Sequence, residues 1–130
     1  MFFRAPAVVK KSRFSYADTV ARLTQAIGAA GNTMFASIDQ SAAARSAGMN
    51  LRPTTLLVFG NPKGGTPLME AVPLAALDLP LKLVVWEDDS GVCVAFTPVA
   101  AISRRYGITG KDALIAKLEQ ALETLTSSVA

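Results

Sequence analysis

Apolar and polar residues change their spacing along the chain several times, and each spacing predicts a strand or a helix. Residues 33–39 alternate between two faces, as a half-buried strand does. Residues 56–59 are apolar without alternation, which predicts a strand inside the sheet, covered on both faces or nearly so. Residues 7–14 favour an extended segment. Because a short polar turn joins the β-prone residues 81–87 and 92–96, these two runs are predicted to pair as an antiparallel hairpin.

Helical spacing and capping signals predict two long helices. Ser15 followed by Asp18 is a variant of the capping box, and apolar residues at helical spacing continue from there to Gly28. Thr109 and Asp112 repeat this pattern before a C-terminal apolar stripe. Shorter helices are predicted over residues 41–47, 68–72 and 98–106.

This order of elements mixes crossovers with a hairpin, which predicts an α+β fold: a two-layer sandwich with a mixed sheet of about five strands. The 130 residues suffice for one domain with a single core, so residues 1–130 are expected to form one domain. No run of eighteen uncharged apolar residues and no signal-like N-terminus are present, so we expect a cytoplasmic protein without a membrane span.

The amino-acid composition excludes several kinds of catalytic and binding site. The chain has no histidine, which excludes Ser-His-Asp and Cys-His nucleophile systems and imidazole-ligated metals within it. Its one cysteine, Cys93, cannot form an intramolecular disulfide and lies in an apolar run, which favours a buried thiol. The net charge is +3 and no basic run exceeds two residues, so we expect no nucleic-acid partner.

The most distinctive stretch, residues 60–67, reads Gly-Asn-Pro-Lys-Gly-Gly-Thr-Pro and follows the apolar strand. Pro67 at or near the first helical position predicts a helix that begins there, with backbone N–H groups free to face an anion. Because Lys63 precedes both glycines, the stretch does not match a nucleotide-binding P-loop.

A simpler anion site is the hypothesis for this stretch. The N–H groups around Gly65 and Thr66, the Lys63 ammonium and the Asn61 amide would hold a phosphate or a carboxylate. The alternative is that Gly64 and Gly65 only supply the backbone angles of a tight turn.

Polar residues at the ends of strands and connectors are further candidates. Lys82, on an apolar strand, would act as a base or a Schiff-base amine or bind a carboxylate. The alternative is a solvated face, or structural pairing of Lys82 with Asp78 or Asp39. Asp39 equally suits the cap of the helix that begins near Ser41, and Arg52 precedes the central strand.

Several stretches resemble the domain of unknown function 302 family, and together they cover nearly the whole chain. They are Met34-Phe35-Ala36-Ser37-Ile38-Asp39, Leu51-Arg52-Pro53-Thr54, Phe59 to Met69, and Ala76 to Lys82 continuing through Trp86-Glu87-Asp88. The resemblance implies a two-layer α+β domain that forms a homodimer, and it implies no reaction. Members commonly carry histidine after the strand-terminal aspartate, whereas Gln40 follows Asp39 here. A role that needs an imidazole at that place therefore does not carry over.

Three functional hypotheses follow. The first is a binding or interaction module that holds a small anionic ligand at Asn61, Lys63, Gly65 and Thr66, assisted by Lys82, Arg52 and Asp39. The second is a lyase- or isomerase-type enzyme that uses Lys82 and Asp39 as acid and base, which requires both in one cleft. The third is a structural dimer without a ligand. No metal site is expected, and the sequence indicates no particular cofactor.

Overall fold

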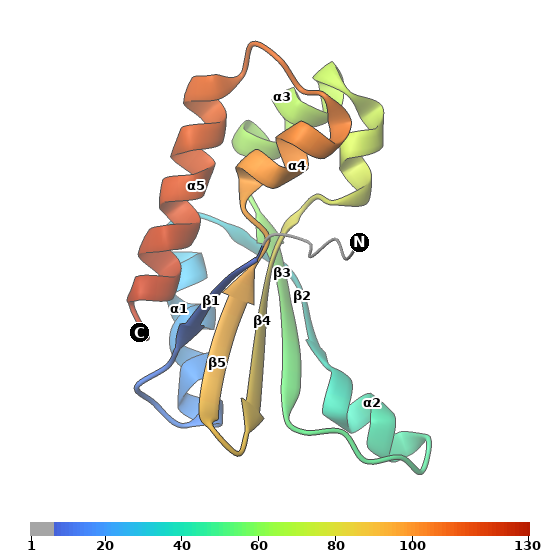
Figure 1. Ribbon diagram of the computed structural model, residues 1–130, viewed down its shortest axis with the longest axis vertical. Coiled ribbons are helices and arrows are strands. Elements are labelled where there is room, and N and C mark those ends of the chain that lie inside the picture. The colour runs from blue at the N-terminus through green and yellow to red at the C-terminus, as the bar shows by residue number, and fades with distance from the viewer. Residues whose placement is uncertain (1–6) are drawn as a thin grey trace, which may run out of the picture.

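A five-stranded sheet lies against the long helices α1 and α5 in the computed structural model, which describes residues 7–130 (Figure 1). The strands are β1 (Val8–Lys11), β2 (Thr33–Asp39), β3 (Thr54–Gly60), β4 (Leu81–Asp88) and β5 (Gly91–Phe96). The helices are α1 (Tyr16–Ala29), α2 (Gln40–Ser46), α3 (Pro62–Ala71), α4 (Val99–Tyr106) and α5 (Asp112–Ser127), with a 3-10 turn η1 (Pro73–Leu77).

The strand order is β1-β5-β4-β3-β2, and every neighbouring pair is antiparallel. The predicted α+β two-layer fold is confirmed, and so is the β4–β5 hairpin. The prediction of a mixed sheet is wrong. Helices α2 and α3 lie at opposite ends of the sheet, where they extend connections between neighbouring strands (Figure 1). They do not cross the face of the sheet, so β3 runs antiparallel to β2, and β4 runs antiparallel to β3.

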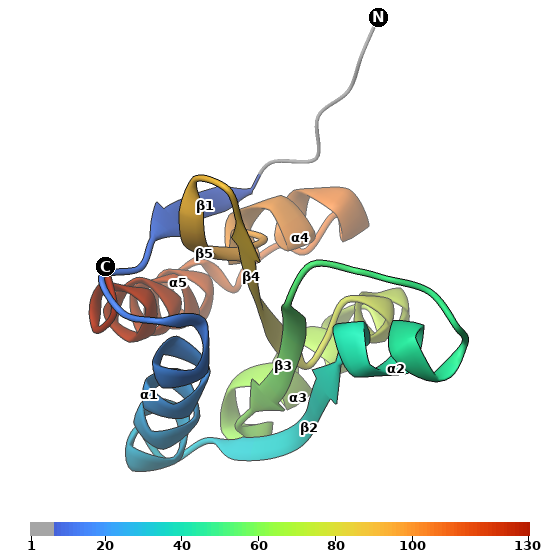
Figure 2. The same ribbon diagram turned by 90° about the horizontal axis from the view of Figure 1, so that it is seen from below.

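The core lies between one face of the sheet and the helices α1 and α5, which Figure 2 shows together on that side. Leu57 and Phe59 of β3 and Leu83 and Val85 of β4 are almost fully buried. They pack in one cluster with side chains of both helices: Leu23, Ile27, Leu122 and Leu125. The alternation of side chains along each strand therefore directs one apolar set into the helical layer.

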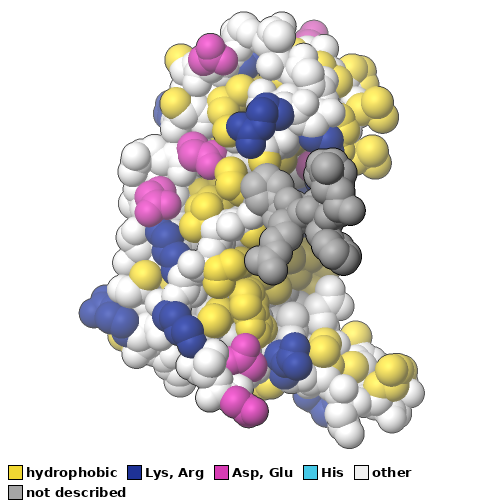
Figure 3. Space-filling model, in the orientation of Figure 1, with side chains coloured by type: hydrophobic (Ala, Val, Ile, Leu, Met, Phe, Trp, Pro, Cys, Tyr) yellow, Lys and Arg dark blue, Asp and Glu magenta, His cyan; other side chains and the backbone are white. Residues whose placement is uncertain are grey.

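Within residues 7–130, the opposite face of the sheet carries no helix, and we call it the open face. Its larger apolar side chains come from four of the strands: Val9, Ile38, Leu56, Val58, Val84 and Trp86. Val9 is 56% exposed and Ile38 is 40% exposed. Figure 3 views the molecule from this side and shows hydrophobic side chains gathered over the strands. The prediction that residues 56–59 form a strand inside the sheet is confirmed, because β3 lies between β2 and β4. The prediction that both faces are covered, or nearly so, is wrong, because Leu56 and Val58 are only partly buried on the open face.

Local signals placed some helix ends correctly. The Ser15 hydroxyl accepts a hydrogen bond from the Asp18 N–H at 3.1 Å, so the predicted cap of α1 is confirmed. Gly107 ends α4 in the left-handed conformation, with φ 63°. The predicted cap at Thr109 is wrong, because Gly110, with φ 72°, turns the chain once more before α5 begins. Among residues 7–130, no helix is both long and apolar enough to span a bilayer.

Candidate functional site

Helix α3 begins directly after β3, at Pro62. The Asn61 side chain caps it by accepting a hydrogen bond from the Lys63 N–H at 3.0 Å. The prediction of a helix that begins at Pro67 is therefore wrong. Pro67 lies inside α3, where its ring removes one potential helical donor. The Asn61–Pro62 pair supplies the two features that favour a helix start, a side-chain acceptor and a proline at the first helical position.

The first-turn backbone groups of α3 are already engaged. Pro62 has no N–H, and the Lys63 N–H is bound by the Asn61 side chain. The N–H groups of Gly64 and Gly65 both donate to the Asn61 carbonyl, at 2.9 and 3.1 Å. Thr66 lies one turn further on, where the helical pattern itself uses the N–H. The structure therefore lacks the free backbone N–H groups on which the anion hypothesis depended.

The two glycines of α3 have different surroundings, and neither has the positive φ of a tight turn. A Cβ on Gly64 would lie 2.8 Å from Cδ2 of Leu118, so the absence of a side chain lets α3 approach α5 closely. A Cβ on Gly65 would meet only Cε of Met69, at 3.7 Å. Gly64 is a packing residue, whereas Gly65 borders a cavity.

That cavity, which we call the joint pocket, has a volume of about 270 Å³. It lies where β2, β3 and β4 meet α3 and α5. Its walls are mainly apolar and include Phe35, Phe59, Pro80, Leu81, Met69 and Leu118. Three polar side chains also line it: Asn32, Asn61 and Thr66. Phe35 is 55% exposed and lies at a register shift between Met34 and Ala36, and such bulges redirect side chains.

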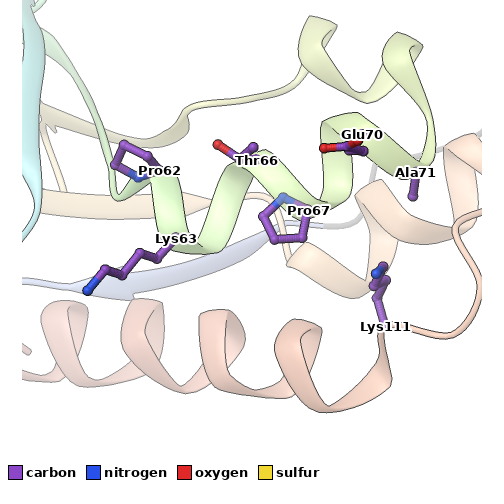
Figure 4. Close-up of a pocket in the computed structure, with 7 residues that line it drawn as sticks. All are labelled: Pro62, Lys63, Thr66, Pro67, Glu70, Ala71 and Lys111. Atoms are coloured by element: carbon purple, nitrogen blue, oxygen red, sulfur yellow. The ribbon is translucent and has the colours of Figure 1, made fainter.

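A second hollow runs along another side of α3 as a shallow groove (Figure 4). Its lining residues are Pro62, Lys63, Thr66, Pro67, Glu70, Ala71 and Lys111. Lys63 extends toward one end of this groove, while Lys111 lies at the other end (Figure 4). The two ammonium groups therefore do not converge on one ligand position. Thr66 and Pro62 border both the groove and the joint pocket.

Lys82 lies apart from the joint pocket. Its residue pairs with Val58 in the sheet, which places the side chain on the open face. The Lys82 ammonium donates to the Pro80 carbonyl at 3.2 Å. Its side chain borders a separate, smaller pocket together with Asp78 and Thr97.

Asp39 and Arg52 lie at the other end of the sheet. Asp39 pairs with Thr55, five residues before Gly60, a separation of roughly 17 Å along β3. The Asp39 carboxylate caps α2 by accepting hydrogen bonds from the Ser41 hydroxyl at 2.6 Å and the Ala42 N–H at 2.9 Å. These bonds lower the pKa of Asp39. The alternative interpretation of Asp39 as a helix cap is confirmed, and Arg52 borders surface grooves at the same end.

The enzyme hypothesis required Lys82 and Asp39 in one cleft, and the structure does not bring them together. Their sheet partners, Val58 and Thr55, are three residues apart on β3, so the two side chains point to opposite faces. They also lie on strands separated by β3. Within residues 7–130, no three His, Cys, Asp or Glu side chains cluster as metal ligands would.

A polar cluster that sequence reasoning missed joins η1 to α4. One oxygen of Asp78, Oδ2, accepts hydrogen bonds from the Tyr106 hydroxyl at 2.6 Å and from Arg105 at 2.8 Å. The Tyr106 hydrogen bond, followed by the Arg105 contacts, lowers the pKa of Asp78. The same carboxylate raises the pKa of Tyr106. Asp78 was a candidate from the sequence, but nothing in the spacing connected it to two residues on a distant helix.

With this geometry established, comparison with known proteins identifies the family. Residues 8–125 match the family described as Domain of unknown function DUF302. The chain belongs to the DUF302 family. A solved structure, that of an uncharacterized conserved DUF302 protein from Bacillus stearothermophilus, has a TM-score of 0.86 with this chain. The match covers 95% of this chain and 98% of the other at 15% sequence identity, so it shows a shared DUF302 fold.

Curated relatives of this DUF302 protein include two longer chains. The Fluoride-specific ion channel FluC 1 of Brucella suis biovar 1 is 37% identical over 102 residues, which are 78% of this chain and 40% of that protein. The protein of the same name from Brucella abortus biovar 1 is also 37% identical over 102 residues, with 38% of its length covered. This chain therefore spans about two-fifths of these relatives, and the activity in their name belongs to the whole proteins.

Proposed function

We propose that this DUF302 protein is a binding module that holds a small molecule in the joint pocket. The observation that carries the proposal is a cavity with mainly apolar walls and a few polar side chains, the usual composition of small-molecule sites. At about 270 Å³ it is near the small end of such sites. The space corresponds to roughly nine water molecules at their share of liquid volume, which suits a compact ligand.

The polar side chains indicate where a ligand's polar group would lie. The Asn61 oxygen is occupied by the helix cap, which leaves its NH₂ group to donate. The Thr66 hydroxyl forms no hydrogen bond within residues 7–130 and borders both the pocket and the Lys63 groove. An anionic group at Thr66, with the apolar part of the ligand against Phe59 and Met69, is the version of the anion hypothesis that this geometry supports.

Filling the pocket tests the proposal. Gly65→Leu places a side chain toward the pocket, and Gly28→Leu makes the same change in α1, where no atom lies within 4 Å of the added Cβ. We expect small carboxylates with short apolar chains to raise the melting temperature of the wild type and of Gly28→Leu. The same compounds should raise the melting temperature of Gly65→Leu clearly less than that of the other two proteins. Equal stabilisation of all three proteins, or of none by any compound, would contradict the proposal.

The name of the curated relatives favours a second candidate, a role alongside fluoride transport. The observation is that a segment 37% identical to this chain forms about two-fifths of a protein named as a fluoride-specific ion channel. The same melting-temperature measurements should therefore include fluoride, with chloride as its control. A higher melting temperature with fluoride than with chloride would support this candidate. Equal melting temperatures with the two salts would show that the protein does not bind fluoride directly.

The homodimer that the family resemblance implies is also part of the proposal, and the open face is the surface we assign to it. This face exposes apolar side chains over β2, β4 and β1, including Ile38, Trp86 and Val9. Arg52 and Asp88 lie together near the β4–β5 turn, at one end of this face. Figure 3 shows charged side chains of both signs at that end of the molecule. In a two-fold interface the same surface is used by both copies, so an apolar face that continues across several strands suits a second copy.

A further inference from the structure

The small pocket beside Lys82 has the features of a second site. It has a volume of about 210 Å³ and lies among η1, the beginning of β4, the end of β5 and α4. Its apolar side includes Leu77, Leu81 and Ile102, and its polar side is formed by Asp78, Lys82 and Thr97. None of these polar residues borders the joint pocket, so a ligand here would meet different chemistry.

The negative charge in this pocket is already compensated. Asp78 pairs with Arg105 at 2.8 Å and accepts the Tyr106 hydroxyl at 2.6 Å, both through Oδ2. Its side chain is 28% exposed, so these contacts are partly shielded from water. Arg105 and Tyr106 both come from the last turn of α4, which fixes the carboxylate against that helix. The Asp78 side chain is therefore held in one position at the edge of the pocket.

Lys82 is near enough to Asp78 for its charge to help lower the pKa of that carboxyl, but Lys82 forms no ion pair with Asp78. Its ammonium makes one hydrogen bond to protein within residues 7–130, to the Pro80 carbonyl at 3.2 Å. No ion pair between Lys82 and a carboxylate occurs within 4.0 Å in this part of the chain. The residue is partly buried, and an ammonium carries three donors. A partly buried cation with unused donors favours an anionic partner.

Taken together, Asp78, Arg105 and Lys82 leave one positive charge in excess beside an apolar surface. We propose that this pocket binds a small organic monoanion. Its carboxylate accepts hydrogen bonds from the Lys82 ammonium and the Thr97 hydroxyl, and its short hydrocarbon chain packs on Leu77 and Ile102. The charge balance selects a monoanion, and the small volume selects a short chain.

Calorimetric titration of the full chain with propionate tests this site. We expect saturable binding to the wild type, weakened about tenfold or more in Lys82→Met, because a charge-assisted hydrogen bond is lost. Thr97→Val should weaken binding less. Propylamine, which has the opposite charge, should not bind. If Lys82→Met does not fold, Thr97→Val alone decides the test, since unchanged binding in that variant would contradict the proposed contact.

Two controls separate this site from the joint pocket. Lys63→Met removes the cation beside the joint pocket, and Gly65→Leu fills that pocket; both should keep the wild-type affinity for propionate at Lys82. Loss of propionate binding in Gly65→Leu, with binding retained in Lys82→Met, would overturn the Lys82 site while supporting the joint pocket. Absence of any propionate binding to the wild type would overturn the Lys82 site, while the joint pocket would still be tested by the other carboxylates of its thermal series.

Discussion

Asp78 shows how a single side chain connects two elements that sequence spacing does not relate. Its carboxylate accepts hydrogen bonds from Tyr106 and Arg105 of α4, which lie 28 and 27 residues away in the chain. The Arg105 side chain is 54% exposed, so its ion pair contributes little to stability in water. The Tyr106 hydrogen bond is the larger cause of the lowered pKa of Asp78. Both contacts favour the ionised carboxylate in the folded state.

This arrangement predicts a pH dependence of stability. Because the folded-state pKa of Asp78 is lowered, its contribution is fully present above the unfolded pKa of about 3.9 and is lost as pH falls through the folded value. We expect the free energy of unfolding of the wild type to exceed that of Asp78→Asn near neutral pH. The difference should narrow below about pH 4. Urea titrations along this pH series measure it, and two curves that stay parallel at acidic pH would contradict the assignment.

Single residues also show what the sequence could indicate. Asp39 was recognised both as a site residue and as a helix cap, and its bonds to Ser41 and Ala42 show that it caps α2. Cys93 is buried, as its apolar neighbours predicted. Lys82 lies on β4, the apolar strand on which it was predicted. The sequence indicated Asp78 as one possible partner of Lys82, and the two side chains border one pocket. The pairing of Asp78 with Arg105 was not predictable, because α4 is distant from Asp78 in the chain.

At the scale of elements, alternation of side chains predicted the strands well, while the start of α3 was misplaced. Two prolines, Pro62 and Pro67, both suit a first helical position, and the glycines between them have low helix propensity. Tertiary packing decided between the two starts, since Gly64 fits against Leu118 of α5. The open face was not predicted from the sequence. When both sides of a strand are apolar, the pattern does not indicate which side the helices cover.

The cap at Asn61 gives a prediction for this element. Asn61→Ala removes the oxygen that accepts the Lys63 N–H, and such losses cost about 1 kcal/mol of stability. Asn61→Asp keeps an acceptor and adds a negative charge near the helix N-terminus, so it should remain close to the wild type. Denaturant unfolding without ligand compares the three proteins. Equal loss in both variants, or in neither, would show that the cap does not hold the start of α3.

At the scale of the whole molecule, the seven residues predicted as one site occupy three places. Asn61, Lys63, Gly65 and Thr66 lie at α3, Lys82 lies on the open face, and Asp39 and Arg52 lie at the far end of the sheet. Sequence motifs identified the α3 group because its members are contiguous. They could not show that the ends of three strands and α5 complete the joint pocket.

The proposed homodimer is also a property of the whole molecule. Val84 lies centrally on the open face, on β4, so Val84→Glu would bury a charge in an interface formed there. We expect the wild type to elute as a dimer in light-scattering chromatography and Val84→Glu as a folded monomer. Thr24→Glu, on the exposed side of α1, should remain dimeric. A monomeric wild type, or an unchanged dimer in Val84→Glu, would contradict this use of the face.

The central claim is that the joint pocket holds a small molecule, and mapping amide resonances during ligand titration tests it most directly. Compounds that stabilise the wild type should shift the backbone amides of Gly60, Gly65 and Thr66, which border the pocket. The amides of α2, at the far end of the sheet, should stay in place. In Gly65→Leu the shifts should disappear. Shifts confined to other regions, or shifts of equal size in Gly65→Leu, would contradict the claim.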